Sequence, residues 1–349
     1  MTLRRIADSL ELSMTTVSRA LNGYPEVSEP TRQRVLAKAK ALNYRPNPNA
    51  TRLATGRSQA VGHVIPLASK NEMVNPIFAD FIAGACETYS RNDYHLVLNV
   101  VRETSIDDAY RNLVEQNTVD GIIIQGPNVV EPRIPLLRDI AIPFVVHGRA
   151  TSEDSEYSWL DVDNCRAFCR ATSLLIEAGH RRVGLINGQD NMDFAYRRKQ
   201  GYCSALRASG IELDADLVSS DEMTETCGYA AAMRMLQSRQ PPTALLVSSI
   251  LSALGARRAV EERGLILGED VWMIIHDDDL SYLKNSGPTP TFTAMKSSVR
   301  EAGRRCAEIL LSLIEDGKSG PVQERWEAEL VVGRSTGKLA IPDPDLQRL

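Results

Sequence analysis

The chain has 349 residues, 43% of them hydrophobic and 24% charged, and its net charge is −5. This length accommodates two or three domains, and the hydrophobic content is ordinary for a soluble protein. No apolar run approaches the roughly 20 residues of a membrane-spanning helix. Arg4, Arg5 and Asp8 interrupt the apolar segment that a signal peptide would need. Composition therefore argues against membrane and secreted proteins and predicts a cytoplasmic protein with no membrane partner.

The charge is unevenly distributed along the chain. Residues 1–57 contain ten Lys and Arg against four Asp and Glu, a net charge of +6, which leaves −11 on the remaining residues. A basic segment attached to an acidic body is typical of a DNA-binding domain joined to a different domain, since basic residues attract phosphates. The charge pattern thus predicts that the N-terminal segment binds nucleic acid.

Cysteine and acidic residues give little sign of a metal site. The six cysteines are scattered, and none forms a Cys-x-x-Cys pair. Cys165 and Cys169 lie one helical turn apart on an apolar helix, which favours buried free thiols over a disulfide or a metal site. The acidic run 277–279 beside His276 could hold a cation, but acidic runs in loops are usually solvated. The sequence therefore predicts no metal and no cofactor.

Two short helices open the chain. Thr2 is placed to cap the first helix, and apolar residues then recur on one helical face. These apolar residues are Leu3, Ile6, Ala7 and Leu10. A three-residue turn, 11–13, leads to the second helix, which Ser13 can cap with its hydroxyl group. The layout predicts a helix-turn-helix, whose second helix enters the major groove of DNA.

The second helix has one apolar and one polar face. Val17, Ala20 and Leu21 are expected to pack inward. The outer face is short and polar, which suits hydrogen bonds to base edges better than packing in a core. It carries Thr15, Thr16, Ser18, Arg19 and Asn22.

A third helix is predicted after Ser28, with four apolar residues facing inward. They are Val35, Leu36, Ala39 and Leu42. Taken from these patterns alone, the segment could also be a small solvated three-helix element that binds no ligand.

A family resemblance rests on the residues of this segment. The run Thr16-Val17-Ser18-Arg19-Ala20-Leu21-Asn22 is followed by Val27-Ser28, Thr31-Arg32 and Leu42-Asn43-Tyr44-Arg45-Pro46-Asn47. Together they resemble the N-terminal domain of LacI/GalR (lac repressor-type) transcription regulators.

The resemblance implies DNA contacts from the second helix and from the linker that follows the third. We expect Met14, Thr15 and Arg19 to face the bases, and Thr16 and Ser18 to contact the DNA backbone. The full set of expected DNA-binding residues is Thr2, Met14, Thr15, Thr16, Ser18, Arg19, Asn22, Asn47, Ala50 and Leu53.

The linker, residues 46–58, begins with two prolines and contains a possible short helix at 50–54. Such a segment is too short to be stably helical by itself. In the family this linker is a hinge that becomes ordered on operator DNA, and a leucine wedges into the minor groove; the matching residue is Leu53. The alternative is an ordinary flexible tether with Leu53 in a surface patch.

From Ala60 onward, short apolar runs alternate with amphipathic helices. This pattern indicates parallel sheets covered by helices on both faces. Predicted strands are 60–66, 95–100, 121–125, 144–147, 159–162, 183–186, 217–219, 244–247, 271–276 and 292–295. Predicted helices are 77–90, 105–116, 164–178, 193–209, 225–239, 250–263 and 299–315.

The predicted architecture is an all-α helix-turn-helix domain followed by an α/β effector domain of two lobes. The latter resembles periplasmic sugar-binding proteins. The domains are 1–45, the hinge 46–58, the two-lobed domain 59–339 and a tail, 340–349. We expect lobe 1 to contain about 59–161 and 292–320, and lobe 2 about 162–291 and 321–339.

Candidate effector-binding residues follow from the predicted strand ends, because ligands of open α/β sheets bind at the carboxyl ends of strands. Arg198 matches the Arg-x-x-Gly of the family, and Asp277 stands at its Gly-Tyr-Asp-Asp position. On opposing strands these two side chains could hold vicinal hydroxyls. The alternative for each charge is a surface ion pair. The full expected set is Ile77, Phe78, His147, Arg149, Arg198, Ser249 and Asp277.

Two departures from the family concern this site. Ser249-Ile250 stands where the family often has Asn-Asp, and Ile275-His276 stands where it has Gly-Tyr. A serine in place of a longer amide predicts a roomier pocket, which could take a disaccharide. Both changes affect the identity of the ligand and leave the fold unchanged.

The sequence thus predicts a sequence-specific DNA-binding transcriptional regulator, a repressor controlled by a sugar bound between the lobes. One helix-turn-helix reads only a half-site, so we expect a homodimer on a pseudo-palindromic operator, with helix 250–262 as its interface. The alternatives are a freestanding sugar-binding protein and a co-repressor-dependent regulator. The sequence has no Walker loop, GxSxG or HExxH motif, which argues against an enzyme.

Overall fold

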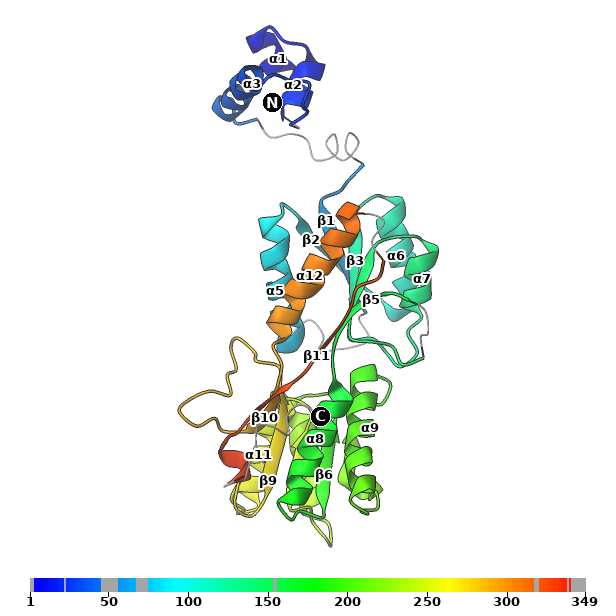
Figure 1. Cartoon of the computed structure of the whole chain (residues 1–349), viewed down its shortest axis with the longest axis vertical. Helices are drawn as coiled ribbons and strands as arrows, with labels where there is room; N and C mark the ends of the chain where they lie inside the picture. Colours follow the sequence, from blue (N-terminus) through cyan, green and yellow to red (C-terminus); the bar gives the residue numbers. More distant parts are fainter. Residues whose placement is uncertain are drawn as a thin grey trace. The chain divides into compact units, whose positions relative to one another are not determined.

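A computed structural model describes residues 3–21, 23–44, 56–66, 75–152, 156–316, 320–337 and 339. They fall into two compact units, divided between Gln59 and Ala60 (Figure 1).

The first unit is a bundle of three short helices. Their bounds are α1 (Leu3–Leu10), α2 (Met14–Leu21) and α3 (Glu29–Ala41). The predicted inward residues of α1 and α2 form its core with Val35 and Ala39 of α3. Leu36 is an exception, since 41% of its surface is exposed. It lies one residue beyond Val35, which rotates it about 100° around the helix and away from the core.

The second unit contains two six-stranded sheets, one in each lobe. The first has the order β11-β5-β4-β3-β1-β2, and its described pairings are parallel. Its strands are β1 (Ala60–Pro66), β2 (His95–Val101), β3 (Gly121–Gln125), β4 (Phe144–His147), β5 (Ser158–Val162) and β11 (Gln323–Trp326).

Helices cover both faces of the first sheet (Figure 1). On one face α5 (Pro76–Arg91) and α12 (Val299–Asp316) pack against Val61, Ile123 and Val145. On the other face α6 (Ile106–Glu115) and α7 (Arg133–Asp139) pack against Ile122 and Ile124. The sequence pattern did not predict α7, a helix of seven residues that includes Pro135.

The second sheet has the order β12-β10-β9-β8-β6-β7. Its described pairings are parallel, except that β12 runs antiparallel to β10. Its strands are β6 (Val183–Asn187), β7 (Val218–Ser220), β8 (Ala244–Val247), β9 (Trp272–Asp277), β10 (Thr293–Lys296) and β12 (Glu329–Val331).

Two helix pairs cover this second sheet. One face packs against α8 (Asn164–Glu177) and α9 (Asp193–Ala208), and the other against α10 (Glu225–Leu236) and α11 (Ile250–Glu262). Short 3-10 helices complete the described elements at Glu103–Ser105, Ala215–Leu217 and Arg334–Thr336. The α/β architecture predicted from the alternating pattern is confirmed.

The predicted division between the lobes is wrong in its C-terminal part. Strand β10 belongs to the second sheet, because its residues pair with 274–277 of β9. Strand β11 belongs to the first sheet, where it pairs with β5, and only β12 returns to the second. The chain therefore crosses between the lobes after β5, after β10 and after β11. The local sequence of such a short strand does not indicate which of the two sheets it joins.

Two further expectations concern helix α11 and the cysteines. Ile250 and Ala253 of α11 are buried in the core of their own lobe, and Leu251 and Leu254 pack against it. Leu251 and Leu254 are half-buried, and the role of this helix as a dimer interface stays a prediction. All six cysteines are free, but only Cys306 is buried, and the other five are half-buried.

Candidate DNA-binding surface and effector site

Helix α2 is fixed at its first turn and along its inner face. The hydroxyl of Ser13 accepts the backbone N–H of Thr16 at 3.0 Å, which confirms Ser13 as the N-cap. Val17 and Ala20 are buried in the core of the three-helix unit. The helix is therefore held rigidly, with its opposite face turned to solvent.

A tight turn ends this helix. Gly23 has a φ of +74°, which glycine adopts without steric cost. The N–H of Tyr24 then donates to the carbonyl of Arg19 at 3.0 Å. From α3, the Arg32 guanidinium donates to the carbonyl of Tyr24 at 2.8 Å and fixes the turn. The sequence analysis missed this role of Arg32.

The outer face of α2 presents the side chains expected to read bases. Met14 is 52% exposed, and Thr15 and Arg19 are also exposed. Thr16 and Ser18 are half-buried, and the Thr16 hydroxyl lies 2.8 Å from the hydroxyl of Ser13. The two groups therefore differ in exposure, and their separate contacts with bases and DNA backbone stay predictions from the sequence.

Five of the expected DNA-binding residues lie outside the described residues. Their roles stay predictions from the sequence. They are Thr2, Asn22, Asn47, Ala50 and Leu53.

In the first lobe, Ile77 and Phe78 lie in the first turn of α5. Asn75 caps this helix, and its side-chain oxygen accepts the N–H of Ile77 at 3.0 Å. Ile77 is half-buried against the core, and Phe78 is buried. Their position at the start of α5 follows from the cap, and a buried Phe78 leaves little ring surface for stacking.

His147 ends β4, and its ring stacks on that of Phe81 with 4.6 Å between centroids. Burial lowers the pKa of His147 to about 4, although the charge of Asp278 in the second lobe opposes the shift. The imidazole is therefore neutral at pH 7.

The contacts of the Arg149 side chain lie within its own lobe. Its Nε donates to Asp161 at 2.8 Å, and its guanidinium lies 4.8 Å from the centre of the Trp159 ring. Burial raises the pKa of Asp161, and Arg149 opposes that shift. The ion-pair alternative therefore describes this residue best.

Arg198 lies on helix α9 and not at a strand end, which corrects the expectation. The side chain is only 5% exposed, and its guanidinium lies about 5 Å from the rings of Phe168 and Phe194 (5.1 and 4.8 Å). Nε donates to Asn164 and Nη1 to the Ser248 carbonyl, both at 2.7 Å. Burial lowers the pKa of Arg198 to about 10, so it stays charged at pH 7.

The side chains of Ser249 and Asp277 each accept a hydrogen bond from a backbone N–H two or three residues further along the chain. The Ser249 hydroxyl caps α11 by accepting the N–H of Ser252 at 3.2 Å, and the residue is fully buried. It therefore gives no support to a roomier pocket. Asp277 accepts the N–H of Asp279 at 2.9 Å, and burial raises its pKa.

Asp278 and Arg198 influence each other's pKa through their charges, although no ion pair or hydrogen bond joins the two side chains in the part of the chain that the structure describes. Burial acts to raise the pKa of Asp278, but His276, Arg198 and His147 together hold it below the usual range. The role of Asp277, the residue at the family's motif position, stays a prediction from the sequence. The buried Leu280, two residues after Asp278, fixes how the chain leaves β9.

Two more polar groups near this position were missed. The side-chain oxygen of Gln125 and Nδ1 of His276 are buried and have no hydrogen-bond partner in the part of the chain that the structure describes. Gln125 ends β3 opposite His147, and His276 lies 3.4 Å from Asp278 (Nε2 to Oδ1). Buried polar groups normally find partners, so such atoms are candidates to bind a polar ligand. Both residues end predicted strands, and this position in the sequence could have indicated them as site residues.

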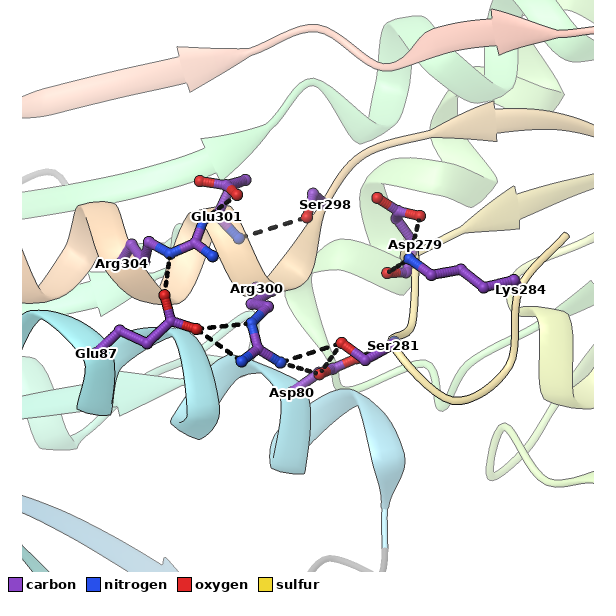
Figure 2. Close-up of polar contacts among 9 residues, drawn as sticks. All are labelled: Asp80, Glu87, Asp279, Ser281, Lys284, Ser298, Arg300, Glu301 and Arg304. Atoms are coloured by element: carbon purple, nitrogen blue, oxygen red, sulfur yellow. Dashed lines mark hydrogen bonds and ion pairs between the residues drawn. The ribbon is translucent and has the colours of Figure 1, made fainter. Parts of the chain in front are cut away.

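The lobes are joined directly on one side by a polar cluster (Figure 2). Asp80 of α5 accepts both the backbone N–H and the hydroxyl of Ser281, which follows β9. Arg300 of α12 donates to Asp80, to the Ser281 hydroxyl and to Glu87. Arg304 adds a further contact to Glu87.

A second set of contacts between the lobes joins the segment after β3 of the first lobe to the start of α9 in the second. The N–H of Val129 donates to the carbonyl of Asn191 at 2.8 Å. Asp193 donates its N–H to the carbonyl of Pro127, and its carboxylate accepts the N–H of Thr151 at 2.6 Å. The polar cluster and this second set of contacts both hold the two lobes against each other.

Two negative findings apply to the residues that the structure describes. No three His, Cys, Asp or Glu side chains gather there in a way that could hold a metal ion. None of the described helices combines the length and apolar character needed to cross a membrane.

Comparisons with known proteins match both units. Residues 2–47 match the model of bacterial regulatory proteins of the lacI family. Residues 59–329 match the model of periplasmic binding proteins and the sugar binding domain of the LacI family.

Individual relatives match over nearly the whole chain. The HTH-type transcriptional regulator AglR of Rhizobium meliloti (strain 1021) is 43% identical over 98% of this chain and 95% of its own. The transcriptional regulator CelR in complex with cellobiose is 29% identical, with a TM-score of 0.71 over 96% of this chain and 99% of that one. The lac repressor dimer bound to operator and the anti-inducer ONPF is 25% identical, with a TM-score of 0.82 over 96% and 99%. The chain therefore belongs to the LacI family of DNA-binding transcriptional regulators.

Proposed function

We propose that the protein is a repressor that binds a pseudo-palindromic operator as a homodimer and releases it when a neutral sugar binds between the lobes. The observation that carries the sugar proposal is the group of buried and half-buried polar side chains that both lobes contribute. Lobe 1 supplies Gln125 and His147, and lobe 2 supplies Arg198, His276 and Asp278.

The charge of this group favours a neutral ligand. Arg198 and Asp278 offset one another, and burial lowers the pKa of both His147 and His276, so both rings are neutral at pH 7. A charged ligand would bring an unpaired charge into this buried site, which is costly. Sugar hydroxyls both donate and accept, as the unpartnered atoms of Gln125 and His276 require.

The size of the sugar is proposed from similarity. A relative that matches nearly this whole chain binds cellobiose, a disaccharide. Disaccharides are therefore the class to examine first. Ser249, fully buried as a helix cap, contributes nothing to this choice.

The dimer contact is proposed on the edge of the first sheet. Strand β2 is an edge strand, and it exposes Leu98 (39%) and Val100 (38%). An open strand edge with exposed apolar side chains readily pairs with another chain.

The repressor has no catalytic role in this proposal, and it acts in the cytoplasm, where its operator DNA lies. The regulators among its relatives support both points. A chemical test is simple, because a sugar incubated with the protein should be recovered unchanged.

The experiment that tests the proposal combines stability with DNA binding. Maltose, sucrose, trehalose and cellobiose are each added at 10 mM to the full-length protein. A disaccharide present at 100 times its dissociation constant should raise the unfolding free energy by about 2.7 kcal/mol. The same disaccharide should weaken operator binding by about 1–3 kcal/mol.

Three results would contradict the proposal. Tighter operator binding in the presence of the sugar would mean a co-repressor. No response to any of the disaccharides, with a response to charged metabolites, would overturn the neutral ligand. Sugar binding without any specific DNA binding would describe a freestanding sugar-binding protein.

A further inference from the structure

Asn164 occupies the point where the chain first crosses from one lobe to the other. It is the first residue of α8, two residues after the end of β5, and its side chain is buried. Its amide nitrogen donates to the carbonyl of Val162 at 3.0 Å and lies 3.4 Å from the carboxylate of Asp161. Its amide oxygen accepts Nε of Arg198 at 2.7 Å. One buried amide thus touches both the crossing strand and the candidate effector arginine.

These contacts belong to a longer polar chain through the crossover. Arg149 follows β4 of the first lobe and pairs with Asp161 at 2.8 Å. Asp161 contacts Asn164, and Asn164 holds Arg198 on α9 of the second lobe. Asp161, Asn164 and Arg198 are each buried, so solvent does not compete for these contacts. This series of polar contacts links the two lobes at the point where the polypeptide first crosses between them.

Arg198 has few other contacts that fix its orientation. The guanidinium lies near two aromatic rings, which do not select one rotation about the side-chain axis. Among the described residues, its only other hydrogen bond is the one to the Ser248 carbonyl. A long arginine side chain that is free to rotate loses entropy when a ligand orders it. The hydrogen bond between Nε and Asn164 orders the side chain before the ligand binds, so this entropy is not lost on binding.

We propose that Asn164 is a positioning residue for the effector, which acts through Arg198 and ties its orientation to the crossover strand. The inference rests on the proposed function, because it takes Arg198 as a sugar-binding residue. A ligand changes DNA affinity only if it binds two lobe arrangements unequally. A rotation of the lobes about 161–164 moves Asn164 relative to the Val162 carbonyl, and with it the guanidinium that meets the sugar.

The test replaces Asn164 in the full-length protein. Asn164→Leu keeps the branched shape and the number of heavy atoms and removes both polar atoms, and Asn164→Ser is a milder variant in case the first one fails to fold. Binding of maltose, sucrose, trehalose and cellobiose is measured by calorimetry, and operator binding is measured without sugar. We expect sugar affinity to fall about tenfold, the effect of losing one hydrogen bond to a charged group, while operator affinity stays within about twofold.

The matched control is Thr172→Val on the same helix. Thr172 is fully buried, and its hydroxyl donates to the carbonyl of Phe168 and not to Arg198. It should reduce stability without changing sugar affinity. Equal losses of sugar affinity in the Thr172 and Asn164 variants would mean that Asn164 only stabilises the fold.

Two further measurements separate the possible failures. Arg198→Met alone should weaken sugar binding, and Asn164→Leu should then add almost nothing, since the two residues act as a unit. Full additivity would overturn the positioning role. If Arg198→Met leaves sugar binding unchanged, the proposed site itself is wrong. Sugar should also slow hydrogen exchange at residues 161–165 in the wild type but not in Asn164→Leu; equal slowing in both would exclude the link to the crossover.

Discussion

Asp80 and Ser281 are 201 residues apart in the chain, yet one carboxylate of the first lobe accepts two hydrogen bonds from a single residue of the second (Figure 2). The Ser281 hydroxyl lies 2.7 Å from Asp80, and Arg300 donates to both partners at 3.1–3.2 Å. Ser281 comes three residues after Asp278. The contact therefore joins α5 and α12 to the segment that carries the candidate effector carboxylate.

Breaking this contact should destabilise the two-lobed domain. Asp80→Asn and Ser281→Ala should each lower the unfolding free energy in urea by about 1–3 kcal/mol, because buried partners lose charge-assisted hydrogen bonds. The double variant should cost clearly less than the sum, since both changes remove the same contact. Asp108→Asn, an exposed carboxylate of the same lobe, is the control and should change little. Strict additivity would show that the two residues act separately.

Asp278 and Asp277 offer a matched pair at the effector site. Asp278→Asn should abolish the effect of disaccharides on operator binding, because Arg198 loses a carboxylate whose charge opposes the effect of burial on its pKa. Asp277→Asn keeps an oxygen that can accept the Asp279 N–H, so the response should persist. Operator titrations with and without the sugars measure both. A normal response in Asp278→Asn would return the assignment to Asp277.

Arg19→Ala tests the recognition helix. Its exposed guanidinium on α2 is expected to reach base edges, so the change should cost about 1–3 kcal/mol and relax the preference at one base position. Binding to a library of operator variants measures both effects. Arg34→Ala, exposed on α3, is the control, and any loss there should be the same for all sequences. Unaltered base preference in Arg19→Ala would remove it from the reading residues.

The edge strand β2 tests the proposed dimer contact. Leu98→Glu with Val100→Glu places like charges against each other across the interface, and the dimer should dissociate at micromolar concentration in sedimentation. Operator affinity should fall with it, because a monomer reads one half-site. Leu213→Glu, an equally exposed leucine of the second lobe, should remain dimeric. Persistence of the dimer in the β2 variant would move the interface elsewhere.

Burial of neutral His147 makes stability depend on pH. Its pKa is about 4 in the folded chain and 6.5 in the reference state. Between these values the unfolded chain binds more protons, so stability falls as the pH drops through this range. From pH 7 to pH 5 this one group should cost about 1–2 kcal/mol. His147→Gln should reduce the pH dependence of the urea midpoint by that amount; an unchanged dependence would show that the ring is readily solvated.

Local sequence patterns predicted the parts of the molecule that depend on neighbouring residues. Ser13 caps α2 because its hydroxyl needs only the N–H three residues on, and Val17 and Ala20 are buried because one helical face is apolar. The alternation of strands and helices likewise gave the α/β architecture. The match of Arg198 to a family motif led to a residue that proves to be deeply buried.

Tertiary structure alone decided what depends on distant pairing. Neither β10 nor β11 has a local feature that selects its sheet, because an edge strand joins the partner that the rest of the fold presents. Which of Asp277 and Asp278 acts on Arg198 depends on how the chain leaves β9, since successive residues of a strand point to opposite faces. The contact of Asn164 with Arg198 and that of Asp80 with Ser281 join segments that approach each other only after both lobes have folded.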